Sequence, residues 1–182
     1  MIFLKKLKSF IINRFYVNET IILFELDKLI LQTSTANICK INNNNLSDIL
    51  NFQDKKSLNI FKDFLLLGYY YGYINNNCIH RSWLKLNEQI VQLHWASPYK
   101  LKQNEAFIHY CETALEARGK NIYPHVLSNI IKEHKDKRIL IAVDDKNIAS
   151  KKGVEKVGFI ESERVRIVIV FGIKFIKKKS QE

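Results

Sequence analysis

Short apolar runs dominate the first half of the chain, and they predict strands and hairpins rather than long helices. Runs of this kind, bounded by asparagine, glycine or proline, are typical of β-strands. The asparagines at 75–77 separate two of the runs and predict a hairpin turn. Leucine, isoleucine and phenylalanine at helical spacing predict short helices from Leu46 and over residues 58–64. The predicted strands are residues 20–26, 29–32 (a second strand or an extension of the first), 65–74, 78–86 and 90–95.

The second half of the chain alternates strand patterns with helix patterns. Each helical pattern follows a run of aliphatic residues, and Gly158 ends the last helix. This order, joined to the hairpins of the first half, predicts a single mixed α/β (α+β) domain with one central sheet. The lysines at 177–179 are expected to form a solvated end. The predicted elements are strand 105–113, helix 123–134, strand 138–143, helix 149–157 and the strand-rich residues 159–176.

Composition supports a folded domain and indicates its expected partners. The chain has 182 residues, 47% of them hydrophobic, which excludes disorder and allows a sizeable core. Its formal net charge of +11 fits either plain solubility or contact with an anionic ligand or surface. Cys39, Cys78 and Cys111 are odd in number and lack metal-ligand spacing. We therefore expect a reducing, cytoplasmic location, with neither a disulfide framework nor a bound metal.

The N-terminal residues combine apolar and basic side chains. Phe3, Leu4, Leu7, Phe10 and Ile11 recur at helical spacing beside lysines. The stretch is too short and too basic to span a bilayer. Two interpretations stay open: a helix that docks on the domain's own core, and an amphipathic helix that makes weak contact with a membrane surface.

One turn in the second half has the features of a phosphate site. Arg118, Gly119 and Lys120 follow a predicted strand and precede a predicted helix. Pro124 suits the first turn of that helix, where a missing N–H leaves no hydrogen bond unmade. Free backbone N–H groups and the helix dipole favour an anion at such a place. Because many strand–helix turns contain a glycine and two basic residues, further motifs must decide what this turn binds.

Two blocks of the second half together resemble the GNAT family of acyl-CoA-dependent N-acetyltransferases. The family's acyl-CoA loop reads Arg/Gln-x-x-Gly-x-Gly/Ala between a strand and a helix, and residues 118–123 (Arg-Gly-Lys-Asn-Ile-Tyr) occupy that place. The family's next block is a strand, Asn-x-x-Ala/Ser, a short helix and Gly-Phe. Residues 139–143, 147–150 and 158–159 follow the same order. The resemblance covers residues 105–165.

This resemblance implies a GNAT-like fold over residues 1–182, with an acceptor-side half in residues 1–104 and an acyl-CoA-binding half in residues 105–176. It implies acetyl-CoA as the acyl donor. It also implies that the backbone N–H of Thr113 donates to the acyl carbonyl while negative charge builds on that oxygen. The residues that it assigns to the donor are Thr113, Leu115, Arg118, Gly119, Lys120, Asn121, Ile122, Tyr123, Asn147 and Ser150.

Three residues depart from the family's pattern. Asn121 stands where the first motif glycine is usual. Because asparagine tolerates the left-handed backbone conformation better than other non-glycine residues, we expect the loop to keep its shape. Tyr123 fills the second small position, where the loop is expected to bend differently. Val154 stands where many members carry a tyrosine that acts as general acid, so the leaving thiolate takes its proton from another group or from water, or leaves without one.

Direct attack of an amine on a thioester requires a group that accepts the proton of the amine. Glu112, on the strand before the loop, is the first candidate base and His109 the second, with a solvated carboxylate and a structural histidine as the alternatives. His80, Arg81 and Trp83 form a cluster at the predicted hairpin. This cluster suits a phosphorylated or sugar-bearing acceptor, through ion pairing and ring stacking. A structural hairpin with a buried Trp83 is the alternative.

Two functions from different classes follow from these residues. The first is an N-acetyltransferase that moves an acetyl group from acetyl-CoA to a primary amine. A loose likeness of residues 118–124 suggests an amino-sugar nucleotide of surface polysaccharide synthesis as the acceptor. The second is a catalytically weak GNAT shell that binds nucleic acid or an anionic membrane surface. The first function predicts acyl-CoA and a small amine as partners, no specific nucleic acid, and either a monomer or a homodimer.

Overall fold

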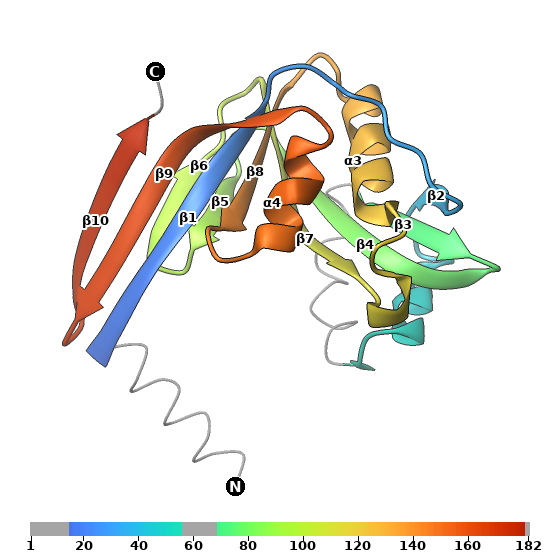
Figure 1. Cartoon of the computed structure of the whole chain (residues 1–182), viewed down its shortest axis with the longest axis horizontal. Coiled ribbons are helices and arrows are strands. Elements are labelled where there is room, and N and C mark those ends of the chain that lie inside the picture. Colours follow the sequence, from blue (N-terminus) through green and yellow to red (C-terminus); the bar gives the residue numbers. More distant parts are fainter. Residues whose placement is uncertain (1–14, 56–68, 181–182) are drawn as a thin grey trace, which may run out of the picture.

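A mixed eight-stranded sheet forms the centre of the molecule (Figure 1). The computed structural model describes residues 15–55 and 69–180. The strands of the sheet lie in the order β10-β9-β1-β8-β7-β4-β3-β2, and β5 and β6 form a separate two-stranded hairpin. The strands are β1 (Tyr16–Leu26), β2 (Asn37–Lys40), β3 (Tyr69–Ile74), β4 (Asn77–Leu86), β5 (Ile90–His94), β6 (Ser97–Lys100), β7 (Glu105–Thr113), β8 (Arg138–Asp144), β9 (Phe159–Val170) and β10 (Ile173–Ser180).

Helix α3 lies against the sheet through an apolar face with helical spacing. Val126, Leu127, Ile130 and Ile131 are buried on that face, as the i, i+4 pattern of an amphipathic helix requires. The shorter helix α4 lies between α3 and β9 and contacts both. The described helices are the 3₁₀ helices η1 (Leu46–Asn51) and η3 (Leu115–Ala117) and the α-helices α3 (Ile122–Glu133) and α4 (Ile148–Glu155).

Strand β1 joins the two halves of the chain in one sheet. It pairs antiparallel with β8 on one side and with β9 on the other. The first strand therefore lies among strands that come from residues 138–180. The predicted boundary between residues 104 and 105 therefore does not divide the sheet. That the first half of the chain binds the acceptor and the second half the donor stays a prediction.

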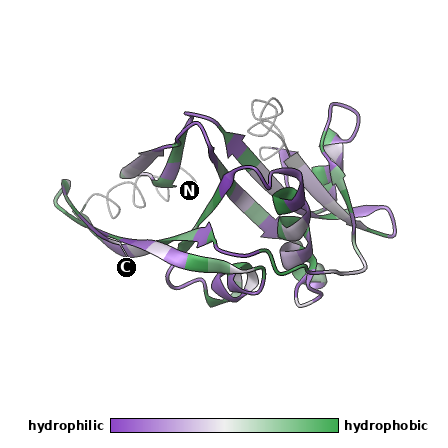
Figure 2. Ribbon diagram, turned by 90° about the horizontal axis from the view of Figure 1, so that it is seen from above, coloured by the Kyte–Doolittle hydropathy of each residue, from purple (hydrophilic) through white to green (hydrophobic). Residues whose placement is uncertain are grey.

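Apolar residues on the two faces of the sheet form separate cores. Ile22 of β1 and Ile108 of β7 belong to the cluster beneath α3 and α4. Their neighbours Leu23 and Phe107 belong to a second cluster, which includes residues of the β5–β6 hairpin. This is the alternation that a strand covered on both faces requires. Figure 2 shows hydrophobic and hydrophilic residues alternating along several strands.

Most predicted elements are confirmed. The hairpin around residues 75–77 is formed by β3 and β4, and the strand predicted over 105–113 coincides with β7. The predicted helices 123–134 and 149–157 correspond to α3 and α4 within two residues at each end. The mixed α/β class is confirmed. The helices predicted from residues 3–11 and over 58–64 lie outside the described residues.

One prediction about local structure is wrong, and another is incomplete. Residues 29–32 form neither a strand nor an extension of β1, because their backbone is bonded to the helical layer. The Ile30 N–H donates to the Val157 carbonyl (2.8 Å), and the Gln32 N–H donates to Ser128 Oγ (3.0 Å). The lysines at 177–179 are solvated as predicted, but they belong to β10 and pair with β9. The exposure expected for these lysines gave no sign that they form the edge strand β10.

Candidate functional site

Strands β7 and β8 separate part-way along their length, and this opens the sheet. They pair in parallel through Glu105–Ile108 of β7 and Arg138–Ile141 of β8. Both strands continue for several residues, but within the described chain they no longer pair with each other. The backbone groups that β7 turns toward β8 after Ile108 are therefore available to an extended ligand.

A β-bulge in β7 lies beside this opening. Arg81 of β4 pairs with Glu112, whereas Trp83 pairs with His109, so two residues of β7 face one residue of β4. One of the two, Tyr110, has a φ of +47°. The buried guanidinium of Arg81 donates to the Tyr110 carbonyl and to Glu112 Oε2, the latter at 2.6 Å. Arg81 therefore braces the bulge from the neighbouring strand.

The loop between β7 and α3 has the backbone conformation expected from its sequence. Gly119 has a φ of +78°, and Asn121 is left-handed with φ 58° and ψ 20°. The Asn121 side chain donates to the Thr33 carbonyl (2.8 Å) and accepts from Lys156 Nζ (2.9 Å). Asparagine thus takes the conformation of the missing glycine and also ties the loop to two other segments.

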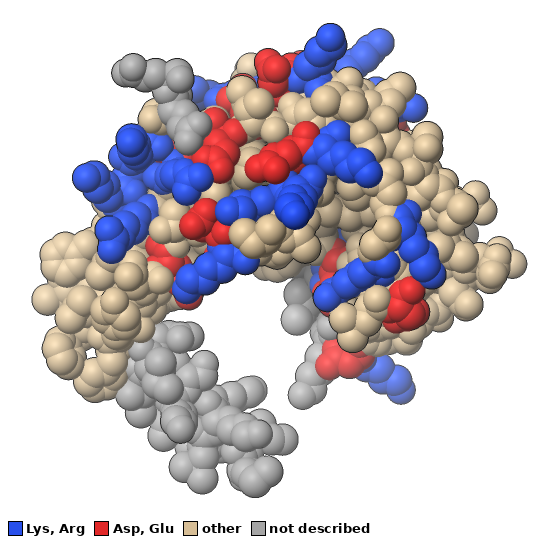
Figure 3. Space-filling model, in the orientation of Figure 1, with Lys and Arg blue, Asp and Glu red and all other residues tan. Residues whose placement is uncertain are grey.

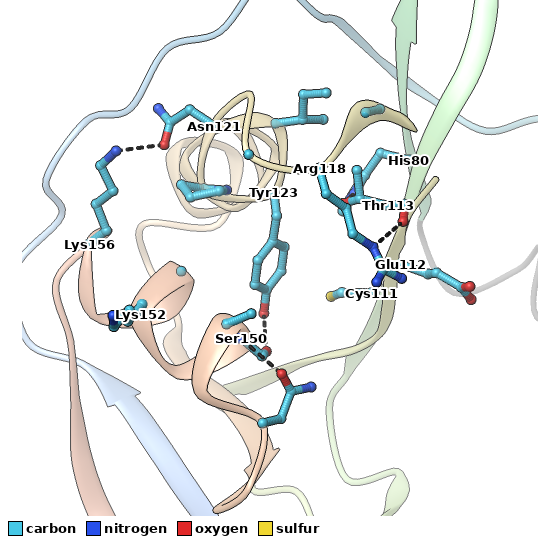
Figure 4. Close-up of a pocket in the computed structure, with 17 residues that line it drawn as sticks. His80, Cys111, Glu112, Thr113, Arg118, Asn121, Tyr123, Ser150, Lys152 and Lys156 are labelled. Carbon is cyan, nitrogen blue, oxygen red and sulfur yellow. Dashed lines mark hydrogen bonds between the residues drawn. The ribbon is translucent and has the colours of Figure 1, made fainter. Parts of the chain in front are cut away.

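A cavity of about 440 Å³ lies between β7, the start of α3 and α4 (Figure 4). The diverging strand, the loop and the second motif block all contribute to its wall. Its lining residues are His80, Cys111, Glu112, Thr113, Ala117, Arg118, Gly119, Asn121, Ile122, Tyr123, Pro124, Asn147, Ala149, Ser150, Lys152, Gly153 and Lys156.

The side chain of Tyr123 extends from α3 toward α4 (Figure 4). Its hydroxyl lies 3.4 Å from Ser150 Oγ. Ser150 in turn donates its backbone N–H to Asn147 Oδ1 (3.0 Å), which caps α4. The aromatic ring lies against Gly153, where an added Cβ would come within 2.7 Å of Tyr123 Cδ1. A bulky residue at the loop is therefore accommodated by a glycine in the facing helix.

Apart from Glu112 and the exposed cations at its mouth, the residues that line the cavity are uncharged at neutral pH. Burial, reinforced by the charge of Arg81, lowers the pKa of His80 to about 3. His80 bonds hydroxyls through both ring nitrogens, Thr113 Oγ1 at 2.7 Å and Ser82 Oγ at 2.8 Å. Burial also raises the pKa of Cys111 to about 11 and that of Tyr123 well above its usual range. The exposed cations at the mouth are Arg118, Lys152 and Lys156.

The structure brings together most of the residues that the sequence assigned to the donor. All of them line the cavity except Leu115, which is 75% exposed, and Lys120, which lines a separate cavity of about 390 Å³. Of the candidate bases, Glu112 lines the cavity and is paired with Arg81. His109 does not line it, and burial lowers its pKa to about 3.

The cluster predicted for the acceptor is not a single site. His80 faces the cavity, but Arg81 braces the bulge. Trp83 is fully buried in a third apolar cluster with Tyr71 and Cys78. The prediction that Trp83 stacks on an acceptor is therefore wrong for this structure, because its ring belongs to the core.

Lys152, Lys156, Cys111 and Gly153 are among the cavity residues that the sequence did not assign to a site. Lys152 and Lys156 project from α4, one helical turn apart, and their i, i+4 spacing was the signal for a shared basic face. Cys111 lies on the inner side of the bulge, which no local pattern predicts. Gly153, inside a predicted helix, was a signal of close packing, because glycine in a helix interior is otherwise unfavourable.

Several solved structures that superpose on this chain are described as acetyltransferases. An acetyltransferase of the GNAT family from Colwellia psychrerythraea superposes with a TM-score of 0.64 at 14% sequence identity, over 94% of this chain and 61% of that one. The chain has the GNAT fold. It spans about three fifths of the length of the Colwellia protein, and 14% identity carries the fold alone.

Two further structures share the GNAT fold. An aminoglycoside N-acetyltransferase in complex with CoA superposes with a TM-score of 0.53 at 14% identity, over 69% of this chain and 92% of that one. A glucosamine N-acetyltransferase region of a fungal multi-domain β-N-acetylglucosaminidase gives 0.60 at 12% identity, over 94% of this chain and 23% of that one. No protein-family model matches the chain, and no curated protein matches it by sequence.

Proposed function

We propose that this protein transfers an acyl group, most simply acetyl, from acyl-CoA to a primary amine. The observation that carries the proposal is the cavity, whose wall bears hydroxyl groups and a single carboxylate, Glu112, among the described residues, and whose mouth at the start of α3 is cationic. Acyl-CoA has matching parts, since a neutral pantetheine arm joins the thioester to phosphates. A binding module without turnover is less favoured, because it gives no reason for an open cavity beside a bulged strand.

The donor is proposed to bind with its phosphates at the mouth of the cavity. Arg118, Lys152 and Lys156 supply positive charge there, and the backbone N–H groups at the start of α3 point toward the same place. The pantetheine arm would follow the open edge of β7 past Thr113, toward Ser150. Asn147 is held by its cap bond to Ser150 and lines the same path.

The chemical step is proposed as direct attack of the amine nitrogen on the acyl carbon. The carbon–sulfur bond breaks, and the sulfur leaves as a thiolate that takes up a proton. The Tyr123 hydroxyl is the proposed donor of this proton, because it reaches the cavity beside Ser150 and its raised pKa keeps it protonated. The amine's proton passes to Glu112 or to water. Arg81 forms an ion pair with Glu112 and holds this carboxylate at the cavity wall.

The acceptor is proposed to be an amino sugar, in its nucleotide-linked form. The support is that structures with this fold include an aminoglycoside N-acetyltransferase and a glucosamine N-acetyltransferase region. A thiol-release assay with acetyl-CoA and a series of amines, among them amino-sugar nucleotides, free amino sugars and polyamines, tests the acceptor. Faster release with polyamines than with any sugar would contradict the sugar assignment but leave the transferase assignment intact.

Calorimetric titration with acetyl-CoA tests the donor site directly. We expect Arg118→Ala and Lys152→Ala to weaken binding by about tenfold each, because each removes a charge-assisted contact to phosphate. Lys100→Ala, on the separate β5–β6 hairpin, is the matched control and should bind normally. Absence of binding to the unaltered protein at millimolar acetyl-CoA would overturn the proposed function.

A further inference from the structure

The outer end of the sheet carries exposed apolar side chains that the proposed transferase site does not use. Tyr16 of β1 is 61% exposed, and Ile173 and Phe175 of β10 are 62% and 58% exposed. Phe171, in the turn between β9 and β10, is 76% exposed, and its ring meets that of Phe15 edge-on at 5.5 Å. Isolated apolar residues are common on surfaces, but a contiguous group of this kind marks an interaction site.

The strand register places Tyr16, Ile173 and Phe175 on one face of the sheet. Ile173 pairs with Val170, which also pairs with Tyr16, and Phe175 pairs with Val168. Cross-strand partners share a face, and so do residues two apart along a strand. The intervening residues, such as Ile169, face the other side and are buried in the cluster that includes the β5–β6 hairpin. The apolar face is thus uncovered on the side of α4.

A basic band follows the apolar residues on the same face. Lys177 pairs with Arg166, and Lys179 lies two residues further along β10. All three are exposed, and within the described residues no carboxylate forms an ion pair with them. In Figure 3 blue lysines and arginines gather over the upper part of this edge, whereas the lower part, toward the β9–β10 turn, is tan. Tyr16, Ile173, Phe175, Arg166, Lys177 and Lys179 form what we call the hairpin face.

We propose that the hairpin face docks on the surface of an anionic lipid bilayer. Residues along a strand are about 3.3 Å apart, so Lys177 lies about 13 Å from Ile173. Apolar side chains of interfacial proteins enter about 5–10 Å into the boundary between headgroups and acyl chains. With Ile173 inserted to that depth, Lys177 and its cross-strand partner Arg166 lie at the level of the phosphate headgroups.

The charge of the hairpin face favours lipid over a second copy of the chain. Two copies paired through β10 would bring their lysines together, and charged residues on an edge strand disfavour such pairing. Anionic lipids, in contrast, attract each basic residue near the surface. None of the described helices is long and apolar enough to cross a membrane, so the proposed contact is peripheral.

Vesicle sedimentation tests this proposal with the full-length protein. The probes are phosphatidylcholine vesicles with and without about 30% phosphatidylserine. We expect binding to the anionic vesicles only, and at least about tenfold weaker binding for Ile173→Ser with Phe175→Ser and for Lys177→Glu with Lys179→Glu. All four residues are exposed, so the variants should fold normally.

Matched controls distinguish vesicle binding by the hairpin face from binding caused by any exposed apolar residue or by net charge. Ile160→Ser changes an equally exposed isoleucine at the other end of β9. Lys100→Glu with Lys135→Glu makes the same change in net charge elsewhere on the surface. Control variants that lose as much binding as the hairpin variants would overturn the proposal. So would an unaltered protein that stays in the supernatant, or hairpin variants that only change the oligomeric state of the free protein. Acetyl-CoA binding without vesicles is a separate measurement, so the two proposals can fail independently.

Discussion

The ring of Tyr123 lies directly over Gly153, and no other residue fits at position 153 without moving the ring. The two residues come from facing helices and together form one wall of the cavity. The resemblance to GNAT sequences assigns a glycine or alanine to the position of Tyr123, at the start of α3. The larger tyrosine side chain is accommodated because the facing position in α4 is a glycine. The contact between Tyr123 and Gly153 fixes the position of the Tyr123 hydroxyl, the one phenolic group among the described lining residues.

Replacing Gly153 by alanine tests this packing. In most exposed helix interiors the change would stabilise the protein by about 0.5–1 kcal/mol. Here we expect a loss of about 1–3 kcal/mol in the free energy of unfolding, because the new methyl group would overlap the Tyr123 ring. Urea unfolding measures the effect. In a Tyr123→Ala background the same change should become neutral or stabilising, and a loss of equal size there would contradict the pairing.

Arg81 is expected to matter more to the site than its partner Glu112. Arg81→Met removes the charged hydrogen bonds of a buried side chain to the Tyr110 carbonyl and to Glu112, at about 1–3 kcal/mol of stability. Because the bulge shapes the open edge of β7, acetyl-CoA affinity should fall as well. Glu112→Gln keeps an acceptor for Arg81 and is the control, with near-normal affinity. Equal affinities for the two variants would show that Arg81 does not hold the bulge.

Stability should decline as pH falls below the ordinary pKa of histidine. His80 and His109 are held neutral in the folded protein, with pKa values near 3 against 6.5 for a free histidine. The unfolded chain gains protons at these residues below pH 6.5 and the folded chain does not, so the stability present above 6.5 is lost down to about pH 3. At full slope each histidine contributes about 1.4 kcal/mol per pH unit.

Unfolding measured at several pH values checks this expectation. His109→Gln should flatten the dependence between pH 6.5 and 4.5 by about one histidine's share, while leaving the cavity intact. An unchanged slope in this variant would mean that His109 is protonated in the folded protein.

Replacing Asn121 is expected to destabilise the protein more when the new residue is alanine than when it is glycine. Asn121→Ala loses the bonds to Thr33 and Lys156 and keeps a left-handed conformation that alanine disfavours by about 1–2 kcal/mol. Asn121→Gly loses the same bonds without that strain. Thermal unfolding should therefore rank asparagine above glycine and glycine above alanine. Glycine and alanine variants of equal stability would contradict a strained backbone at this position.

The sequence predicted the backbone of the loop before α3 well, because short motifs report local backbone geometry. Asn121 in place of glycine predicted a left-handed residue, and the structure has one. The order of strand, loop and helix around residues 118–123 required no long-range information. What the sequence could not supply was the contact that holds the bulge at Tyr110, since Arg81 comes from a different strand.

The acceptor side was predicted less well, for a related reason. A cluster of adjacent residues on a strand points to alternate faces, so His80 and Trp83 cannot share a site simply because they are close in sequence. The interpretation of Trp83 as a stacking platform failed because its ring was needed to fill the core beside η1. Similarly, residues 29–32 have strand-like composition, but the hydrogen bonds that they make are to Val157 and Ser128, far along the chain.

The position of β1 has a consequence for how the molecule assembles. Its two neighbours, β8 and β9, are synthesised more than a hundred residues after it, so β1 cannot be completed as a central strand until nearly the whole chain is available. Such distant pairing slows folding, because a long loop must close before the contact is made. Until then both backbone edges of β1 are unpaired, and its isoleucine, leucine and phenylalanine side chains are not yet buried. We therefore expect the nascent chain to bind chaperones.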